Sequence, residues 1–184
     1  MLHVFVEGPD DESFFSKIYG IYFGTFKFVQ YAGWPHAKIN SFIYSIGCMP
    51  DNDYIFLSDA DGKPVEEKKD ILLRRYSNLV SSKLFIVQYE IESWYYAGAS
   101  ETTCQKLKLK HYIYNTDNIT KEDFYSRLPQ RSDRKFIMAE LLELYELGVA
   151  TSRNTSLSIF DSNFKKSPLN AVYHTTGYSK LLHD

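Results

Sequence analysis

The sequence has no long apolar run and few cysteines, and both absences limit the class of protein. No stretch approaches the ~20 consecutive apolar residues that a transmembrane helix requires. The first residues lack the basic start and long hydrophobic segment of a secretory signal peptide. The two cysteines, Cys48 and Cys104, do not have the spacing of a zinc site. A reduced, cytoplasmic protein without a membrane segment is therefore expected.

A strong excess of either charge is also missing. The formal net charge is −2, which argues against a protein that wraps nucleic acid non-specifically. Hydrophobic residues make up 44% of the 184 residues, including 15 Tyr and 13 Phe. This composition is typical of one folded domain with an aromatic-rich core.

Short apolar segments alternate with helical patterns through the first half of the chain. Strands are predicted at 2–7, 26–31, 53–59 and 83–89, and helices at 10–22, 35–47 and 65–76. Asp10 is the predicted N-cap of the first helix. The alternation predicts βαβ units and an α/β fold with a mostly parallel, four-stranded sheet flanked by helices.

The second half of the chain has no clear strand pattern. Helices are predicted at 101–109, 117–128, 134–147 and 157–164, the third of them ending at Gly148. We therefore predict a core at 1–98 and a helical C-terminal extension at 99–184, packed on the same domain.

Acidic residues stand where three of the predicted strands end. Because ligands of parallel sheets bind beyond the carboxyl ends of the strands, these side chains are expected to meet at one edge. Such a group repels itself unless cations are bound, and oxygen-only ligands favour Mg²⁺ or Mn²⁺. The acidic residues are Glu7 and Asp11, Asp59 and Asp61, and Glu90 and Glu92, the last pair expected to point the same way on an extended strand.

Each acidic group also has an ordinary structural interpretation. Asp11 alone is typical of a helix N-terminus, and Glu90 and Glu92 are compatible with a solvated strand end. An Asp-x-Asp-Gly turn such as Asp59 to Gly62 is common in loops, and its glycine position excludes an EF-hand. The convergence of all three groups is what favours a metal centre.

Two of these segments resemble the motifs of the TOPRIM family. Val6-Glu7-Gly8-Pro9-Asp10-Asp11 resembles the first motif, a glutamate ending strand one. Leu57-Ser58-Asp59-Ala60-Asp61-Gly62 resembles the second, an Asp-x-Asp after strand three. Glu90-Ile91-Glu92-Ser93-Trp94 is similar to a signature of small TOPRIM-like proteins, several of them associated with anti-phage defence. The resemblance covers residues 2–98.

The resemblance implies a role for particular residues. By it, Glu7, Asp59 and Asp61 carry the metal chemistry, and Asp11 and Glu90 are further ligands. In the nuclease branch, which includes overcoming-lysogenization-defect nucleases and is related to ribosomal-RNA maturases, a C-terminal lysine often completes the site. Lys135 and Arg153 are the candidates here for contacting phosphate, although Lys135 is equally typical of a solvated helix start.

The resemblance implies a metal-dependent nuclease that hydrolyses phosphodiester bonds in DNA or RNA. Glu7 is expected either to bind metal or to act as the general acid and base. Topoisomerase and primase activities need further domains that 184 residues do not accommodate. Two alternatives stay open. One is a non-catalytic or partner-dependent TOPRIM subunit that acts as a homodimer or with an ATPase, and the other is a flavodoxin-like phosphatase, against which Glu7 in place of a nucleophilic aspartate counts.

A basic and aromatic segment lies beyond the predicted core. The segment contains four basic residues close together in the sequence, Lys106, Lys108, Lys110 and His111, followed by Tyr112 and Tyr114. Lysines with neighbouring aromatics are able to bind single-stranded nucleic acid by charge and stacking. A solvated surface is the equally acceptable interpretation of the same pattern.

Overall fold

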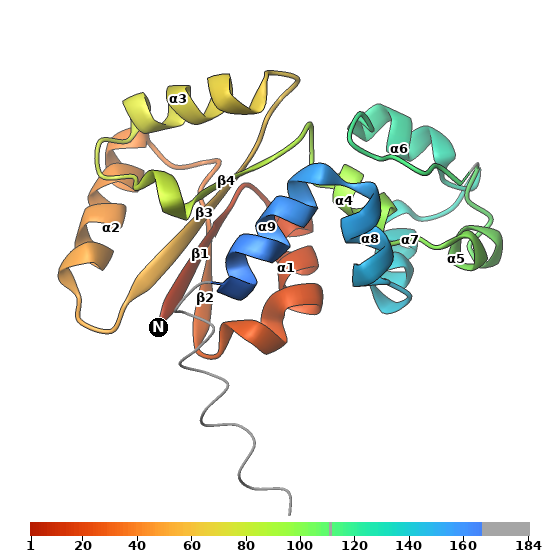
Figure 1. The fold of residues 1–184 in the computed structure, drawn as a ribbon, viewed down its shortest axis with the longest axis horizontal. Helices are drawn as coiled ribbons and strands as arrows, with labels where there is room; N and C mark the ends of the chain where they lie inside the picture. Colours follow the sequence, from red (N-terminus) through yellow and green to blue (C-terminus); the bar gives the residue numbers. More distant parts are fainter. Residues whose placement is uncertain (111, 167–184) are drawn as a thin grey trace, which may run out of the picture.

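The computed structural model describes residues 1–110 and 112–166, and a four-stranded parallel sheet lies at its centre (Figure 1). The strands are β1 (Leu2–Val6), β2 (Phe26–Gln30), β3 (Asp53–Asp59) and β4 (Leu84–Val87). They are arranged in the order β2-β1-β3-β4, and every neighbouring pair is parallel. The predicted α/β architecture is thereby confirmed.

Helices cover both faces of the sheet. Helices α2 (His36–Cys48) and α3 (Val65–Arg75) lie on one face, and α1 (Pro9–Phe23) and α9 (Thr155–Lys166) lie on the other (Figure 1). Alternate residues of each strand point to opposite faces, so each face has its own hydrophobic core. Burial on both faces explains why the strands are continuously apolar rather than alternating.

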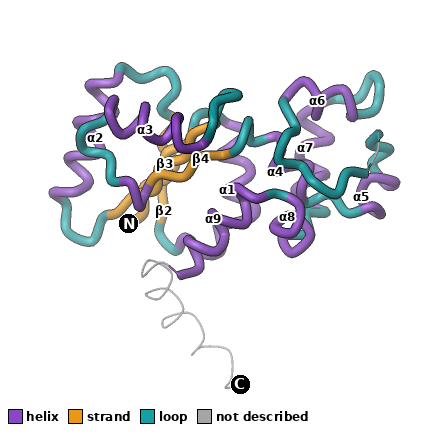
Figure 2. Tube along the Cα trace, turned by 45° about the horizontal axis from the view of Figure 1, so that its top comes forward, coloured by secondary structure: helices purple, strands orange, loops and turns teal. Residues whose placement is uncertain are grey.

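A helical lobe adjoins the sheet on the side of α1 and α9 (Figure 2). Its helices belong to the same hydrophobic core as α1, β1 and α9, so the C-terminal half packs on the sheet domain. None of the helices within the described residues is long and apolar enough to cross a membrane. The lobe consists of α4 (Glu92–Ala97), α5 (Glu101–Lys106), α6 (Lys121–Arg127), α7 (Arg134–Glu143) and α8 (Leu147–Arg153).

Three sequence predictions of local structure were wrong. The helix predicted at 134–147 ends at Glu143, and Gly148 lies inside α8 instead of ending a helix. Helix α1 begins at Pro9 with Gly8 as its N-cap, so Asp10 is not the cap. The predicted strand 83–89 is shorter, because Tyr89 has a left-handed backbone conformation with φ 62°.

The contact between Gly98 and Tyr145 joins two parts of the lobe. Tyr145 donates a hydrogen bond to the carbonyl of Trp94 (2.8 Å), and the amide of Glu146 donates to the carbonyl of Gly98 (3.1 Å). A Cβ atom on Gly98 would lie 2.2–2.5 Å from ring atoms of Tyr145. No real Cβ contact is so short, so only glycine fits at this position.

The first prediction concerns this contact. Gly98→Ala forces the partly buried Tyr145 ring to move, and such overpacking costs about 1–3 kcal/mol. For a chain of this size that corresponds to a fall of roughly 2–4 °C in melting temperature per kcal/mol. The matched control is Gly148→Ala, which lies in helix α8 with no atom within 4 Å of the new Cβ. Circular dichroism melts of both variants should separate them, and equal melting temperatures would contradict the proposed packing.

Candidate functional site

Glu7 lies directly after β1 and is held by three hydrogen-bond donors. Its Oε1 accepts from the Ser58 hydroxyl (2.8 Å), the Asp59 backbone amide (3.1 Å) and the Tyr31 hydroxyl (3.2 Å). The strands β1 and β3 are neighbours in the sheet, which is why Glu7 and Asp59 meet. These bonds fix one oxygen of Glu7 at the carboxyl end of the sheet.

Asp11 is buried and Asp59 is half-buried beside Glu7. Asp11 is 6% exposed, and its Oδ2 accepts a hydrogen bond from the Gly8 amide (3.1 Å). Burial, together with the charges of Glu7 and Glu92, raises the pKa of Asp11 to about 7. Burial and the nearby carboxylates, of which Asp11 is the strongest, raise the pKa of Asp59 well above its ordinary value. Both aspartates are therefore held in surroundings that disfavour their charged form.

Glu92 is the fourth carboxylate at this point, and it is 1% exposed. It opens helix α4, and its Oε1 accepts a hydrogen bond from the Tyr125 hydroxyl (2.8 Å). Its Oε2 is buried and has no hydrogen-bond partner within the described residues. The same is true of Asp59 Oδ1.

These side chains form one electrostatic group, which we call the carboxylate cluster. Each of the others raises the pKa of Asp59 through its charge. A buried carboxylate oxygen without a partner is costly, and a cation satisfies it while removing the repulsion. The carboxylate oxygens are therefore chemically suited to a hard divalent ion, because such ions prefer oxygen ligands. The carboxylate cluster consists of Glu7, Asp11, Asp59 and Glu92.

The cluster is not a preformed metal cage. Across residues 1–110 and 112–166, no three His, Cys, Asp or Glu side chains already converge at the spacing of a metal site. The four carboxylates are near enough to affect one another's ionisation, but they would have to close together around a cation.

Asp61 and Glu90 lie at the rim of the cluster. The Asp61 carboxylate is 59% exposed and pairs with Lys68 of α3 at 2.5 Å. Glu90 Oε2 accepts a hydrogen bond from the Lys121 amide (2.7 Å), the first residue of α6. Glu90 and Glu92 were expected to point the same way on a strand. That expectation was wrong, because the turn at Tyr89 ends the extended conformation.

The lobe brings two cations to the cluster. Lys121 Nζ lies 3.2 Å from Glu92 Oε1, and Arg134 pairs with Asp10 at 3.7 Å. Arg134 also donates a hydrogen bond to the Tyr125 hydroxyl (2.8 Å), which itself donates to Glu92. Burial alone would lower the pKa of Lys121, but the charge and hydrogen bond of Glu92 raise it overall. A chain of polar contacts therefore joins α6 and α7 to the carboxylates.

The predicted phosphate-contacting residues have different surroundings. Lys135 is exposed at the start of α7, and it is its neighbour Arg134 that makes the contacts to Asp10 and Tyr125. Arg153 is 5% exposed, and its guanidinium donates to the carbonyls of Ala97 (2.8 Å) and Ala99 (2.5 Å) and also to that of Ile113. Arg153 holds the end of α4 in place, so a role in contacting phosphate is corrected to a structural one.

Sequence reasoning left Glu92 without a role and assigned no contact with the carboxylates to Lys121, Tyr125 or Arg134. Glu92 was visible as part of Glu90-Ile91-Glu92, but its burial depends on where β4 ends. No local pattern marks Lys121 or Arg134, because helices α6 and α7 reach the cluster only through tertiary packing.

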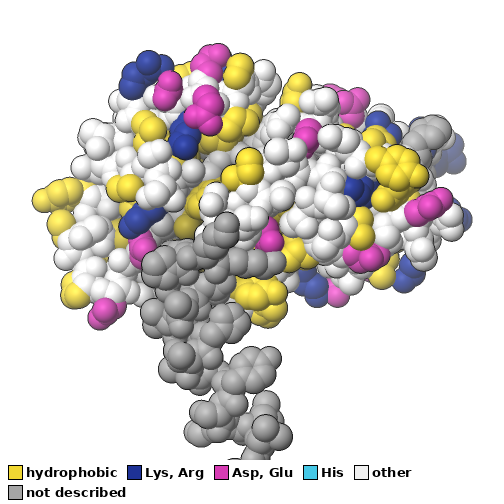
Figure 3. Space-filling view, viewed as in Figure 1, with side chains coloured by type: hydrophobic (Ala, Val, Ile, Leu, Met, Phe, Trp, Pro, Cys, Tyr) yellow, Lys and Arg dark blue, Asp and Glu magenta, His cyan; other side chains and the backbone are white. Residues whose placement is uncertain are grey.

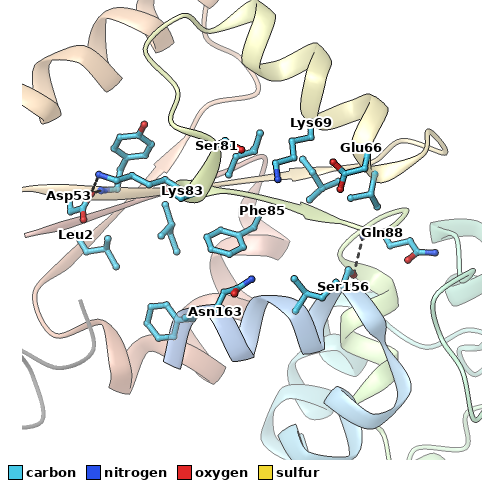
Figure 4. A pocket seen from close by; sticks show the side chains of 18 of the residues that line it. Leu2, Asp53, Glu66, Lys69, Ser81, Lys83, Phe85, Gln88, Ser156 and Asn163 are labelled. Atoms are coloured by element: carbon cyan, nitrogen blue, oxygen red, sulfur yellow. Dashed lines mark hydrogen bonds and ion pairs between the residues drawn. The ribbon is translucent and has the colours of Figure 1, made fainter. Parts of the chain in front are cut away.

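A separate cavity of about 1240 Å³ runs along the edge strand β4, between α3 and α9 (Figure 4). Lys69, Phe85 and Asn163 are among its lining side chains, and no member of the carboxylate cluster lines it. The amide of Gln88 donates to the hydroxyl of Ser156 at one end of it (3.1 Å). The candidate site is therefore the carboxylate cluster at the strand ends and not this cavity.

Comparison with family models, with curated proteins and with solved structures gives no match to this chain.

The second prediction tests the repulsion within the cluster by its pH dependence. Asp11 keeps its proton up to about pH 7 when folded but loses it near 3.8 when unfolded. The metal-free protein therefore loses stability as pH rises from about 4 to about 7. Asp59→Asn removes one charge, so in EDTA at pH 8 it should raise the free energy of unfolding by about 1 kcal/mol, or roughly 2–4 °C. At pH 5, where Asp11 keeps its proton and repels Asp59 less, the same substitution should change the free energy of unfolding less.

The matched control for that experiment is Asp70→Asn, on the exposed side of α3. Differential scanning fluorimetry at the two pH values measures all three proteins. A variant of Asp59 that is less stable than the parent at pH 8 would show that the carboxylates do not repel one another.

Proposed function

We propose that this chain is a divalent-metal-dependent nuclease of the TOPRIM type, which hydrolyses phosphodiester bonds in DNA or RNA. The observation that carries the proposal is the pair of buried carboxylate oxygens without partners, Asp59 Oδ1 and Glu92 Oε2. They come from different elements, β3 and α4, and face the same group of charges. A parallel sheet that presents such a group at its carboxyl end supports the TOPRIM assignment.

The cluster supplies the ligands for Mg²⁺ or Mn²⁺ in this proposal. Glu7, Asp59 and Glu92 would hold the ion, with Asp11 beside them and Asp61 and Glu90 at the rim. When bound, the ion would neutralise phosphate charge and activate a water molecule. A second ion is compatible with the number of carboxylates.

Neighbouring residues of the chain position the Glu7 carboxylate for the reaction. Tyr31 and Ser58 hold Glu7 Oε1, which leaves the other oxygen of Glu7 to face the substrate or the ion. As an alternative to binding the ion, Glu7 would accept a proton from water. Its three hydrogen bonds keep the carboxylate from turning away during the reaction.

Lys121 and Arg134 are the cations we assign to the substrate phosphate. Lys121 lies 3.2 Å from Glu92 and Arg134 lies 3.7 Å from Asp10, so both stand next to the carboxylates. The planar guanidinium of Arg134 is able to donate two parallel hydrogen bonds to phosphate oxygens, and the Lys121 ammonium adds a compact positive charge. Charge that develops on the transferring phosphate would be stabilised by both.

The third prediction tests the activity. Purified protein with Mn²⁺ or Mg²⁺ should cleave plasmid, single-stranded DNA or RNA, and EDTA should abolish cleavage. Asp59→Ala should reduce the rate by at least about 100-fold, as loss of a charge-stabilising group commonly does. Asp61→Asn should reduce it less, because Asp61 is exposed and paired with Lys68. Asp70→Ala is the control on the far side of α3 and should retain full activity.

A different result would favour the competing function. One such result is that neither metal supports cleavage, while Mn²⁺ raises the melting temperature of the parent but not that of Asp59→Ala. The chain then binds metal but does not cleave nucleic acid by itself. Tight association with an ATPase would then assign it as a partner-dependent subunit. If Mn²⁺ affects neither protein, the metal centre itself is contradicted.

The fourth prediction separates Arg134 from its neighbour Lys135. Arg134→Ala should lower kcat by about 10- to 100-fold, because it removes a positive charge that pairs with Asp10 beside the cluster. Lys135→Ala should leave kcat within a factor of two, because its side chain is exposed. Single-turnover cleavage of a labelled oligonucleotide measures both variants. Equal losses would show that position 135 contacts the substrate, as the sequence alone predicted.

A further inference from the structure

A basic and aromatic surface lies on the helical lobe, beyond the carboxylate cluster. No acidic residue occurs between Glu101 and Asp117 in the sequence, while three exposed lysines do. In Figure 3 this end of the molecule, at the right, carries basic, hydrophobic and acidic side chains. We name it the lysine–tyrosine surface, and it consists of Lys106, Lys108, Lys110, Tyr114 and Arg127.

The fold turns the lysines outward. Leu107 and Leu109 alternate with them and pack on the core, Leu109 being 8% exposed. Lys108 has a left-handed backbone conformation with φ 54°, which ends α5 and lets the chain continue along the lobe. The amide of Lys110 donates to the carbonyl of Arg127 (2.8 Å), so the segment is attached to the end of α6.

Tyr114 is exposed, and its ring packs against a neighbouring aromatic ring. Its side chain is 83% exposed, and its ring packs edge-on against Tyr112 with centroids 5.2 Å apart. The Tyr112 ring in turn lies 4.3 Å from the guanidinium of the buried Arg153. An aromatic ring held by its neighbours and open on its outer face is suited to stacking on a base.

Helix α6 links this surface to the carboxylate cluster. Its first residue, Lys121, contacts Glu92, and its last residue, Arg127, lies 5.7 Å from the Tyr96 ring. Six residue steps along a helix correspond to about 9 Å. Arg127 Nε is buried without a hydrogen-bond partner in the part of the chain that the structure describes.

We infer that the lysine–tyrosine surface binds single-stranded nucleic acid and leads it along α6 to the carboxylate cluster. The inference rests on the proposed nuclease function and specifies its substrate class. Lysines contact phosphates of any strand, but a base stacks on Tyr114 only if it is unpaired. The net charge of −2 and the small size of the surface also disfavour a duplex, which needs a larger basic interface.

The test is a binding measurement in EDTA, where no cleavage occurs. Fluorescence anisotropy compares single-stranded DNA, single-stranded RNA and duplex DNA of the same length. Tyr114→Ala should weaken single-strand binding roughly 5- to 100-fold, which corresponds to the loss of one stacked base. Replacing Lys106, Lys108 and Lys110 with Ala should reduce the slope of log K against log salt concentration by about 2. Tyr44→Ala, 62% exposed on α2, is the control and should have no effect.

The outcomes separate this inference from the nuclease proposal. Unchanged single-strand affinity in Tyr114→Ala, or tighter binding of duplex than of single strands, overturns the inference even if Mn²⁺-dependent cleavage is observed. Tyr114-dependent binding without any cleavage supports the surface and contradicts the nuclease. The DNA and RNA arms then identify which single strand is bound more tightly.

Discussion

The arrangement of this protein depends on carboxylates that are buried together at one edge of a parallel sheet. β1 and β3 are neighbours in register, which places Glu7 next to the backbone of Asp59. Both faces of the sheet are covered by helices, so the strand ends are the part of the sheet left for polar chemistry. Water is largely excluded from Glu92 and from Asp59 Oδ1, and repulsion there is correspondingly strong.

The helical lobe completes the surroundings of these charges. Helix α6 contributes Lys121 and Tyr125, and α7 contributes Arg134, all from a part of the chain that follows the sheet. Arg153 fixes the lobe by donating to carbonyls at the end of α4 and to that of Ile113, so the helix that carries Glu92 is held at both ends. The lobe is therefore part of the site, and the boundary near residue 98 separates sequence patterns and not independent units.

The sequence was a good guide to the sheet and to half of the site. Apolar runs bounded by turns predicted all four strands, and the acidic residues after them predicted where charge collects. Glu92 and Arg134 were harder to place, because their positions follow from a single left-handed residue at Tyr89 and from helix packing across the lobe. Such features depend on contacts between residues distant in sequence, which no local pattern records. Arg153 was misjudged for the same reason, since its burial is tertiary.

Protonation and cation binding would both relieve the repulsion, but they do not satisfy the same atoms. A protonated carboxyl group has to donate its hydrogen bond as well as accept one. Asp59 Oδ1 and Glu92 Oε2 have no hydrogen-bond partner within the described residues. A proton on Asp59 Oδ1 or on Glu92 Oε2 would be a buried donor without an acceptor. A proton on the second oxygen of either carboxyl group would leave Oδ1 or Oε2 as a buried acceptor without a donor. A cation bound between them would satisfy both oxygens at once, and this is the physical reason for the metal centre that we propose.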